Sequence, residues 1–136
     1  MRSTTIPLLL LVLLGVAQQP AKPTMVETGK EFSVHYGQEV IVSGEKLRIE
    51  FTSVPSDSRC PSGVTCIWAG NGSVAIEVSI KNKKKVEATL NTFLNPREIS
   101  YHGFKIKLVD LTPYPKASEE RDPKDYVATF MVTREE

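Results

Sequence analysis

The sequence has few of the residues from which catalytic and metal sites are usually built. Its 136 residues include two cysteines, two histidines and one tryptophan. The histidines, His35 and His102, are far apart, and no nucleophile-elbow, metalloprotease or phosphate-loop pattern is present. With both thiols expected to be joined to each other, the chain lacks the ligand spacing of a zinc site. We therefore expect a protein that is not an enzyme and that holds no metal and no cofactor.

An excess of charge of one sign is also lacking. The 17 basic and 16 acidic side chains leave a formal net charge of +1. No broad basic field is available to attract nucleic acid or an anionic membrane, so we expect neither as a partner. The acidic run Glu119, Glu120, Asp122 and Asp125 lacks the regular oxygen spacing and the glycine of a calcium loop. We interpret this run as a solvated charged segment.

Long apolar runs are absent apart from one near the N-terminus. There, Met1-Arg2 precedes an apolar stretch of about ten residues, too short for a membrane span of roughly twenty. This pattern predicts a signal peptide over residues 1–17, with cleavage after Ala17 and a retained anchor as the alternative. No cysteine follows that could carry a lipid, so we expect a secreted or periplasmic protein without a membrane span after cleavage. Residues 18–30, with Pro20 and Pro23, are predicted to form a flexible leader before a single domain over residues 31–136.

Helical periodicity is missing, and apolar and polar residues alternate from about residue 31 onward. Leu47, Ile49 and Phe51, for example, share one face of an extended chain and leave the charged residues on the other. Strands are predicted over residues 32–36, 39–42, 46–51, 74–80, 86–92, 98–101, 104–108 and 126–133. Their length and spacing predict an all-β fold: an antiparallel β-sandwich or partly open barrel of about seven to nine short strands.

Turn chemistry separates the predicted strands. Asn71-Gly72 is interpreted as a hairpin turn, although Asn71-Gly72-Ser73 also matches a glycosylation sequon. Lysines crowd the turn that begins at Lys81 and form a basic hairpin tip. The segment 113–124 is rich in proline and charge, and we expect a long exposed loop that is loose rather than functional.

Both cysteines and the tryptophan fall within residues 57–70. Cys60 and Cys66, with five residues between them, are expected to form a disulfide in an exported chain. Closing so short a loop stabilises the fold by about 2 kcal/mol. If the chain is extended after Cys66, the Trp68 side chain leaves the same face and helps to bury the disulfide. In this structural interpretation Arg59 is held by Asp57 or another nearby carboxylate.

A functional interpretation of the same segment stands beside the structural one. A disulfide-closed loop loses little entropy on binding, and Arg59 and Trp68 are of residue types enriched in binding hot spots. Asp57, Arg59, Trp68 and Tyr114 are therefore candidate binding residues of a monomeric, non-catalytic domain that contacts a protein or peptide at the cell envelope. One alternative is a protease inhibitor that uses Arg59 beside Cys60 as its bait residue. Another is a secreted hydrolase whose site is not visible in the sequence.

The motif D-S-R-C-P-x4-C-x-W-x-G over residues 57–70 is followed by a V-x-I-x-V strand from Val74 to Val78. With the later Leu111-Thr112-Pro113-Tyr114-Pro115 stretch, it resembles an uncharacterised family of small exported bacterial β-rich proteins. The resemblance covers most of the chain after the N-terminal segment. It implies an exported β-rich domain in a bacterium, and it carries over no catalytic residue.

Overall fold

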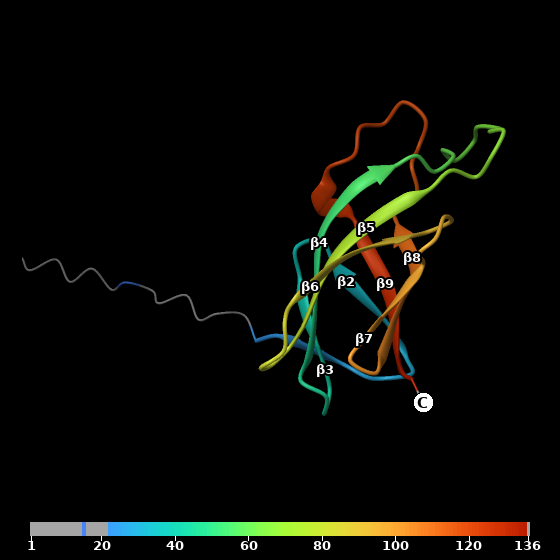
Figure 1. The fold of residues 1–136 in the computed structure, drawn as a ribbon. Coiled ribbons are helices and arrows are strands. Elements are labelled where there is room, and N and C mark those ends of the chain that lie inside the picture. Colours follow the sequence, from blue (N-terminus) through green and yellow to red (C-terminus); the bar gives the residue numbers. More distant parts are fainter. Residues whose placement is uncertain (1–14, 16–21, 136) are drawn as a thin grey trace, which may run out of the picture.

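The computed structural model describes Gly15 and residues 22–135 of the chain (Figure 1). The predicted signal peptide over residues 1–17, apart from Gly15, and the first residues of the predicted leader lie outside the described residues. Within the described part, no helix has the length and apolar character that a membrane span needs. The chain folds into two open β-sheets with no closed barrel, which confirms the all-β prediction and favours the sandwich over the barrel.

Nine strands make up the two sheets in the described chain. The first sheet contains, in spatial order, β1 (Thr24–Val26), β3 (Glu39–Val42), β4 (Leu47–Asp57), β5 (Gly72–Ile80) and β6 (Val86–Asn91). The second contains β2 (Glu31–His35), β9 (Val127–Arg134), β8 (Phe104–Thr112) and β7 (Glu98–Tyr101). Eight of these strands match the predicted ones, with β4 and β8 extending further than the alternation indicated. A short 3-10 helix, Pro123–Asp125, precedes β9.

Strand β1 was not predicted, because it lies within the expected leader of residues 18–30. Thr24, Met25 and Val26 pair in parallel with three residues of β3, and Val26 is buried. A three-residue strand with one buried side chain is too short to show an alternating pattern. Among the described residues, sheet structure therefore begins at Thr24, before the expected domain boundary at residue 31.

The hydrophobic core lies between the two sheets and comes from alternate residues of most strands. Leu47, Ile49 and Phe51 of β4 are fully buried, as are Ala128 and other alternate residues of β9. This inward-outward alternation is the pattern that the sequence predicted. An antiparallel sheet that buries one face in this way fixes the register of its strands, because a slip of one residue would expose every core side chain.

The two ends of the sandwich differ in their chemistry. Figure 1 shows that the connections 58–71 and 113–122 extend from one end, with the connection 92–97 in the same half of the molecule. The short turns at residues 43–46, 81–85 and 102–103 lie at the other end. Irregularities in the pairing of β4 with β5 and of β8 with β9 lie toward the loop end. Such bulges bend a strand and change the direction of the chain beyond it.

Four glutamates form a row across the outer face of the first sheet. Glu39 pairs with Glu50, Glu50 with Glu77, and Glu77 with Glu87, so like charges lie directly opposite each other on four adjacent strands. Arg48 bonds Glu39 at 2.5 Å and Lys85 bonds Glu77 at 2.6 Å. Among the described residues Glu50 has no ion pair of its own. Like charges opposite one another destabilise a sheet.

Replacing Glu50 with glutamine is expected to raise the free energy of unfolding by about 0.5 kcal/mol at low salt, because it removes the central charge of the row. Urea denaturation measures the change. The matched control is Glu31→Gln, since Glu31 is exposed on β2 and faces Met131 instead of a carboxylate. An unchanged or lower stability of the Glu50 variant, relative to this control, would contradict the prediction.

Candidate functional site

Asp57, the last residue of β4, forms a buried ion pair with Arg59. The Arg59 Nε donates to Asp57 Oδ1 at 2.8 Å and Nη2 donates to Oδ2 at 2.8 Å. The side chains are only 5% exposed for Arg59 and 9% for Asp57. Arg59 also donates to the backbone carbonyls of Leu111 and Pro113. One guanidinium thus ties the start of the 58–71 connection to the end of β8.

Two further side chains reach the same carboxylate. Arg121 Nη1 donates to Asp57 Oδ2 at 2.9 Å, and the Tyr126 hydroxyl donates to the same oxygen at 2.8 Å. Arg121 also donates to the carbonyl of Pro113 at 3.1 Å. The segment 113–124 is largely exposed, as predicted, but it is fixed through these bonds. The expectation of a loose loop missed them, because Asp57 lies more than fifty residues away in the sequence.

Several opposing effects act on the ionisation of Asp57. Burial is the largest single influence and raises its pKa, but the hydrogen bonds from Arg59 and Tyr126, with the charge of Arg59, outweigh it. The pKa of Asp57 therefore lies below its ordinary value of 3.8. The same contact contributes to a raised pKa at Tyr126, whose hydroxyl is desolvated by burial and bonded to the carboxylate. Asp57 is accordingly an anchoring anion and not a proton donor near neutral pH.

The 58–71 connection rises from this anchor as a braced loop. Cys60 and Cys66 are disulfide-bonded, as predicted. Below the disulfide, the amide of Ser58 donates to the carbonyl of Asn71 and the amide of Cys60 donates to the carbonyl of Ala69, both at 2.8 Å. The base of the loop is therefore held by backbone hydrogen bonds, and the disulfide closes its tip.

Gly70 allows the two sides of the loop base to approach closely. Its φ is +75°, and a Cβ placed there would lie 1.9 Å from the carbonyl oxygen of Ser58. Only glycine has both the freedom to adopt this φ and the space to do so.

Trp68 does not bury the disulfide, which corrects the prediction. Cys66 is exposed, and residues 63–71 form no regular strand, so Cys66 and Trp68 do not share the face of an extended chain. The indole packs edge-on against Phe93 of the 92–97 connection, with 6.0 Å between the ring centroids. About half of the indole remains exposed. Trp68 therefore joins two connections that are distant in the sequence.

Asn71 is buried, and the hairpin turn predicted at Asn71-Gly72 is absent. Gly72 begins β5, and the Asn71 side-chain carbonyl accepts hydrogen bonds from the amides of Phe93 and Leu94, both at 3.0 Å. Its amide group donates to Asn91 Oδ1 at 2.9 Å. Asn71 thus holds the 92–97 connection beside the disulfide loop. Because the side chain is buried and fully engaged, the sequon is not accessible in the folded protein.

These contacts display an exposed apolar surface that we call the apolar tip: Val64, Ile67, Trp68, Phe93 and Leu94. Ile67 is completely exposed at 105%, and the other four side chains are between 46% and 56% exposed. The sequence carries no charged residue from Cys60 to Ile76 or from Ala88 to Pro96. A concentration of exposed aromatic and aliphatic side chains without charge is characteristic of the centre of an interaction surface.

The four candidate binding residues have different places in this arrangement. Asp57 and Arg59 are buried and support the loop from below, so neither offers a contact surface. Tyr114 is half-exposed and lies against Arg59, whose Cζ is 4.7 Å from the ring centroid. Trp68 belongs to the apolar tip. Because Arg59 is buried, it also cannot serve as a protease bait residue.

The candidate residues expected from the sequence did not include Ile67, Phe93 and Leu94 of the apolar tip. The one local signal was the absence of charge around each of them. It could not show that the 58–71 and 92–97 connections meet, because their contact depends on the buried side chain of Asn71.

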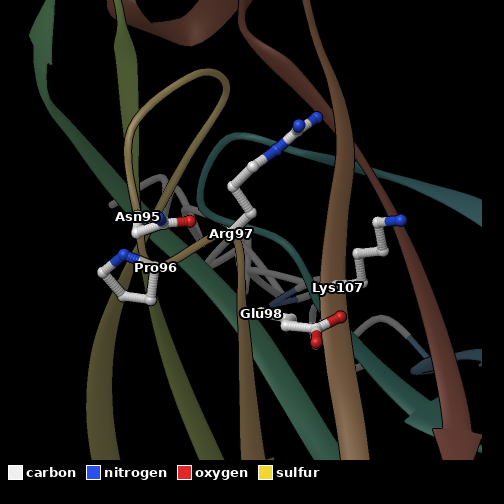
Figure 2. A pocket seen from close by; sticks show the side chains of 5 residues that line it. All are labelled: Asn95, Pro96, Arg97, Glu98 and Lys107. Carbon is white, nitrogen blue, oxygen red and sulfur yellow. The ribbon is translucent and has the colours of Figure 1, made fainter.

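One hollow of the surface lies beside the 92–97 connection and does not bring its charged groups together. It has a volume of about 410 Å³ and is lined by Asn95, Pro96, Arg97, Glu98 and Lys107. Figure 2 shows that the charged ends of Arg97, Glu98 and Lys107 point apart. Across the described residues, no group of three or more histidine, cysteine, aspartate or glutamate side chains is arranged to hold a metal ion.

The Asp57 anchor leads to a pH-dependent prediction. Asp57→Asn is expected to lower the free energy of unfolding by about 3 kcal/mol near pH 6, because it leaves Arg59 buried without its counter-charge. A carboxyl with a lowered pKa stabilises the fold above its unfolded value and loses this effect as the pH falls through its folded pKa. The difference in the free energy of unfolding between wild type and variant should therefore become smaller as the pH falls well below 3.8. Urea denaturation near pH 6 and again at the acidic pH measures this difference. A difference that stays constant between the two conditions would contradict the prediction.

The close approach at Gly70 can be separated from its positive φ by a pair of substitutions. Gly44→Ala, at a φ of +78° with nothing within 4 Å of the added Cβ, should lower the free energy of unfolding by about 1 kcal/mol. Gly70→Ala should lower it by about 3 kcal/mol or more, because its Cβ meets the Ser58 backbone. Thermal or urea denaturation gives both values. Equal losses of unfolding free energy at the two positions would show that the contact with the Ser58 backbone is unimportant.

Any functional conclusion about this protein depends on the geometry described above, because no family model matches the chain, and no curated protein and no solved structure is significantly similar to it.

Proposed function

We propose that this protein is an exported, non-catalytic binding domain that recognises a protein partner at the bacterial cell envelope through its apolar tip. The observation that carries the proposal is the exposure of five uncharged apolar side chains on two connections that are held rigidly together. Large apolar side chains exposed without a structural need for exposure are typical of interaction sites.

The rigidity of the apolar tip supports a binding role for its exposed side chains. The disulfide, the Asp57–Arg59 ion pair and the Asn71 hydrogen bonds restrict the connections before any partner arrives. A surface ordered in advance loses less entropy on association, so more of its contact energy appears as affinity. Trp68 is a residue of the type most enriched in binding hot spots, and Tyr114 lies on the same loop end of the sandwich.

The compartment is part of the proposal. A disulfide bond is typical of proteins that fold in an oxidising space, and the N-terminal sequence has the pattern of a secretory signal. We propose that the domain acts as a monomer after export.

Substitutions in the apolar tip test the proposed function. Ile67→Asp and Leu94→Asp each introduce a charge into the tip without touching the buried anchors, and each should weaken capture of a partner from envelope extract by at least about 30-fold in affinity. The matched control is Met25→Asp, since Met25 is also a half-exposed apolar side chain but lies on edge strand β1. The partner is identified from the wild-type capture by mass spectrometry, and its affinity for each variant is then measured with purified proteins. Equal binding by tip variants and control would overturn the proposal.

A further inference from the structure

Ile67 is the most exposed large apolar side chain in the described protein, and its immediate neighbours are exposed as well. Residues 62–69 are all exposed and form no regular strand or helix. The segment on both sides of Ile67 is therefore accessible to a partner. Ile67 is the most exposed residue of the apolar tip, and we call it the crest of the tip.

Both residues that flank Ile67 are restrained. Cys66 precedes it and is tied to Cys60 by the disulfide, and Trp68 follows it and packs on Phe93. Beyond Trp68, the carbonyl of Ala69 accepts a hydrogen bond from the amide of Cys60. The peptide bond between Ile67 and Trp68 thus lies in a short exposed segment whose two ends are held to the same residue, Cys60.

We propose that the partner is an endopeptidase whose specificity pocket accepts an aliphatic side chain, and that Ile67 enters this pocket so that the braced loop blocks the active site. This inference rests on the proposed function and names the class of its partner. A peptidase inserts one side chain of its substrate into a specificity pocket beside its catalytic groups. A segment that is already ordered and exposed can occupy the active site, and its restrained ends oppose the separation that follows cleavage.

The shape of the tip favours a pocket-bearing enzyme over a second copy of this chain. A convex crest needs a concave and apolar receptor. The hollow beside the 113–122 connection is lined by Pro113, Tyr114 and five charged residues: Lys116, Glu119, Glu120, Arg121 and Asp125. Because most of this lining is charged, the hollow is a poor receptor for the Ile67 of a second copy.

A lipid surface is also less well matched than an enzyme. The 113–122 connection is bonded to the disulfide loop, because the amide of Ser62 donates to the carbonyl of Pro115. This connection carries the exposed acidic residues Glu119 and Glu120. The same connection also carries Lys116 and Arg121, so it has no excess of positive charge to attract the anionic head groups of a bacterial membrane.

Ile67, and not Arg59, is the bait residue of this inhibitory loop. Arg59 is buried and bonded to Asp57, so it cannot enter a pocket. The 92–97 connection then serves as a second contact, because Asn71 fixes Phe93 and Leu94 beside the crest.

Inhibition assays with defined peptidases test the inference directly. The wild-type protein, with its disulfide intact, should inhibit elastase or subtilisin and should not inhibit trypsin, whose pocket requires a basic side chain. Ile67→Arg should reverse this pattern, weakening inhibition of the first pair by at least about 30-fold and creating inhibition of trypsin. Met25→Arg adds the same charge on strand β1 and should behave as wild type. A thermal unfolding transition like that of the wild type shows that each variant is folded.

Four results would overturn the inference, and the last of them leaves the proposed binding function standing. One is the absence of inhibition of elastase and subtilisin together with no gain of trypsin inhibition by Ile67→Arg. Another is rapid and complete cleavage of the Ile67–Trp68 bond, seen by mass spectrometry, which would make the loop an ordinary substrate. The third is binding to phosphatidylglycerol vesicles with a blue shift of the single tryptophan, Trp68, which would identify a lipid surface instead. Tip-dependent capture of a partner that is not a peptidase would leave the proposed binding function standing while this inference fails.

Discussion

The buried ion pair between Asp57 and Arg59 is the interaction on which the loop end of this sandwich depends. Removing charges from water is unfavourable unless their hydrogen-bonding groups are satisfied. Here the carboxylate receives Arg59, Arg121 and Tyr126, while Arg59 also reaches two backbone carbonyls. The end of β4, the end of β8 and the start of β9 are consequently joined at one point.

The apolar tip is built on that anchor in two stages. Backbone hydrogen bonds hold the base of the 58–71 connection, and the disulfide closes its outer part. The side chain of Asn71 then attaches the 92–97 connection, and Trp68 packs against Phe93 above it. The second stage uses a buried polar side chain, Asn71, to place the exposed apolar residues Phe93 and Leu94. This division explains why the polar residues of the motif are structural while the surface they support is suited to recognition.

Much of the fold could be predicted because alternation is a local signal. Leu47, Ile49 and Phe51 face the core because successive side chains of a strand point to opposite faces, and this holds whatever strand lies beside them. Strand β1 could not be predicted in the same way, since only Val26 among its three residues is buried. The spatial order of the strands, with β2 paired to β9, depends on contacts between residues nearly one hundred positions apart.

The candidate site was predictable only where its partners are close in the sequence. The pairing of Cys60 with Cys66 and the contact of Arg59 with Asp57 span a few residues, so composition and spacing indicated both. The burial of Arg59 beneath Leu111 and Pro113, and the grip of Asn71 on Phe93, join residues twenty to more than fifty positions apart. By itself the sequence determined the alternating strands and the disulfide, because local periodicity and the presence of two thiols leave few alternatives. Only the tertiary structure decided which motif side chains are buried and which form the apolar tip, because burial is a property of the elements packed around a residue.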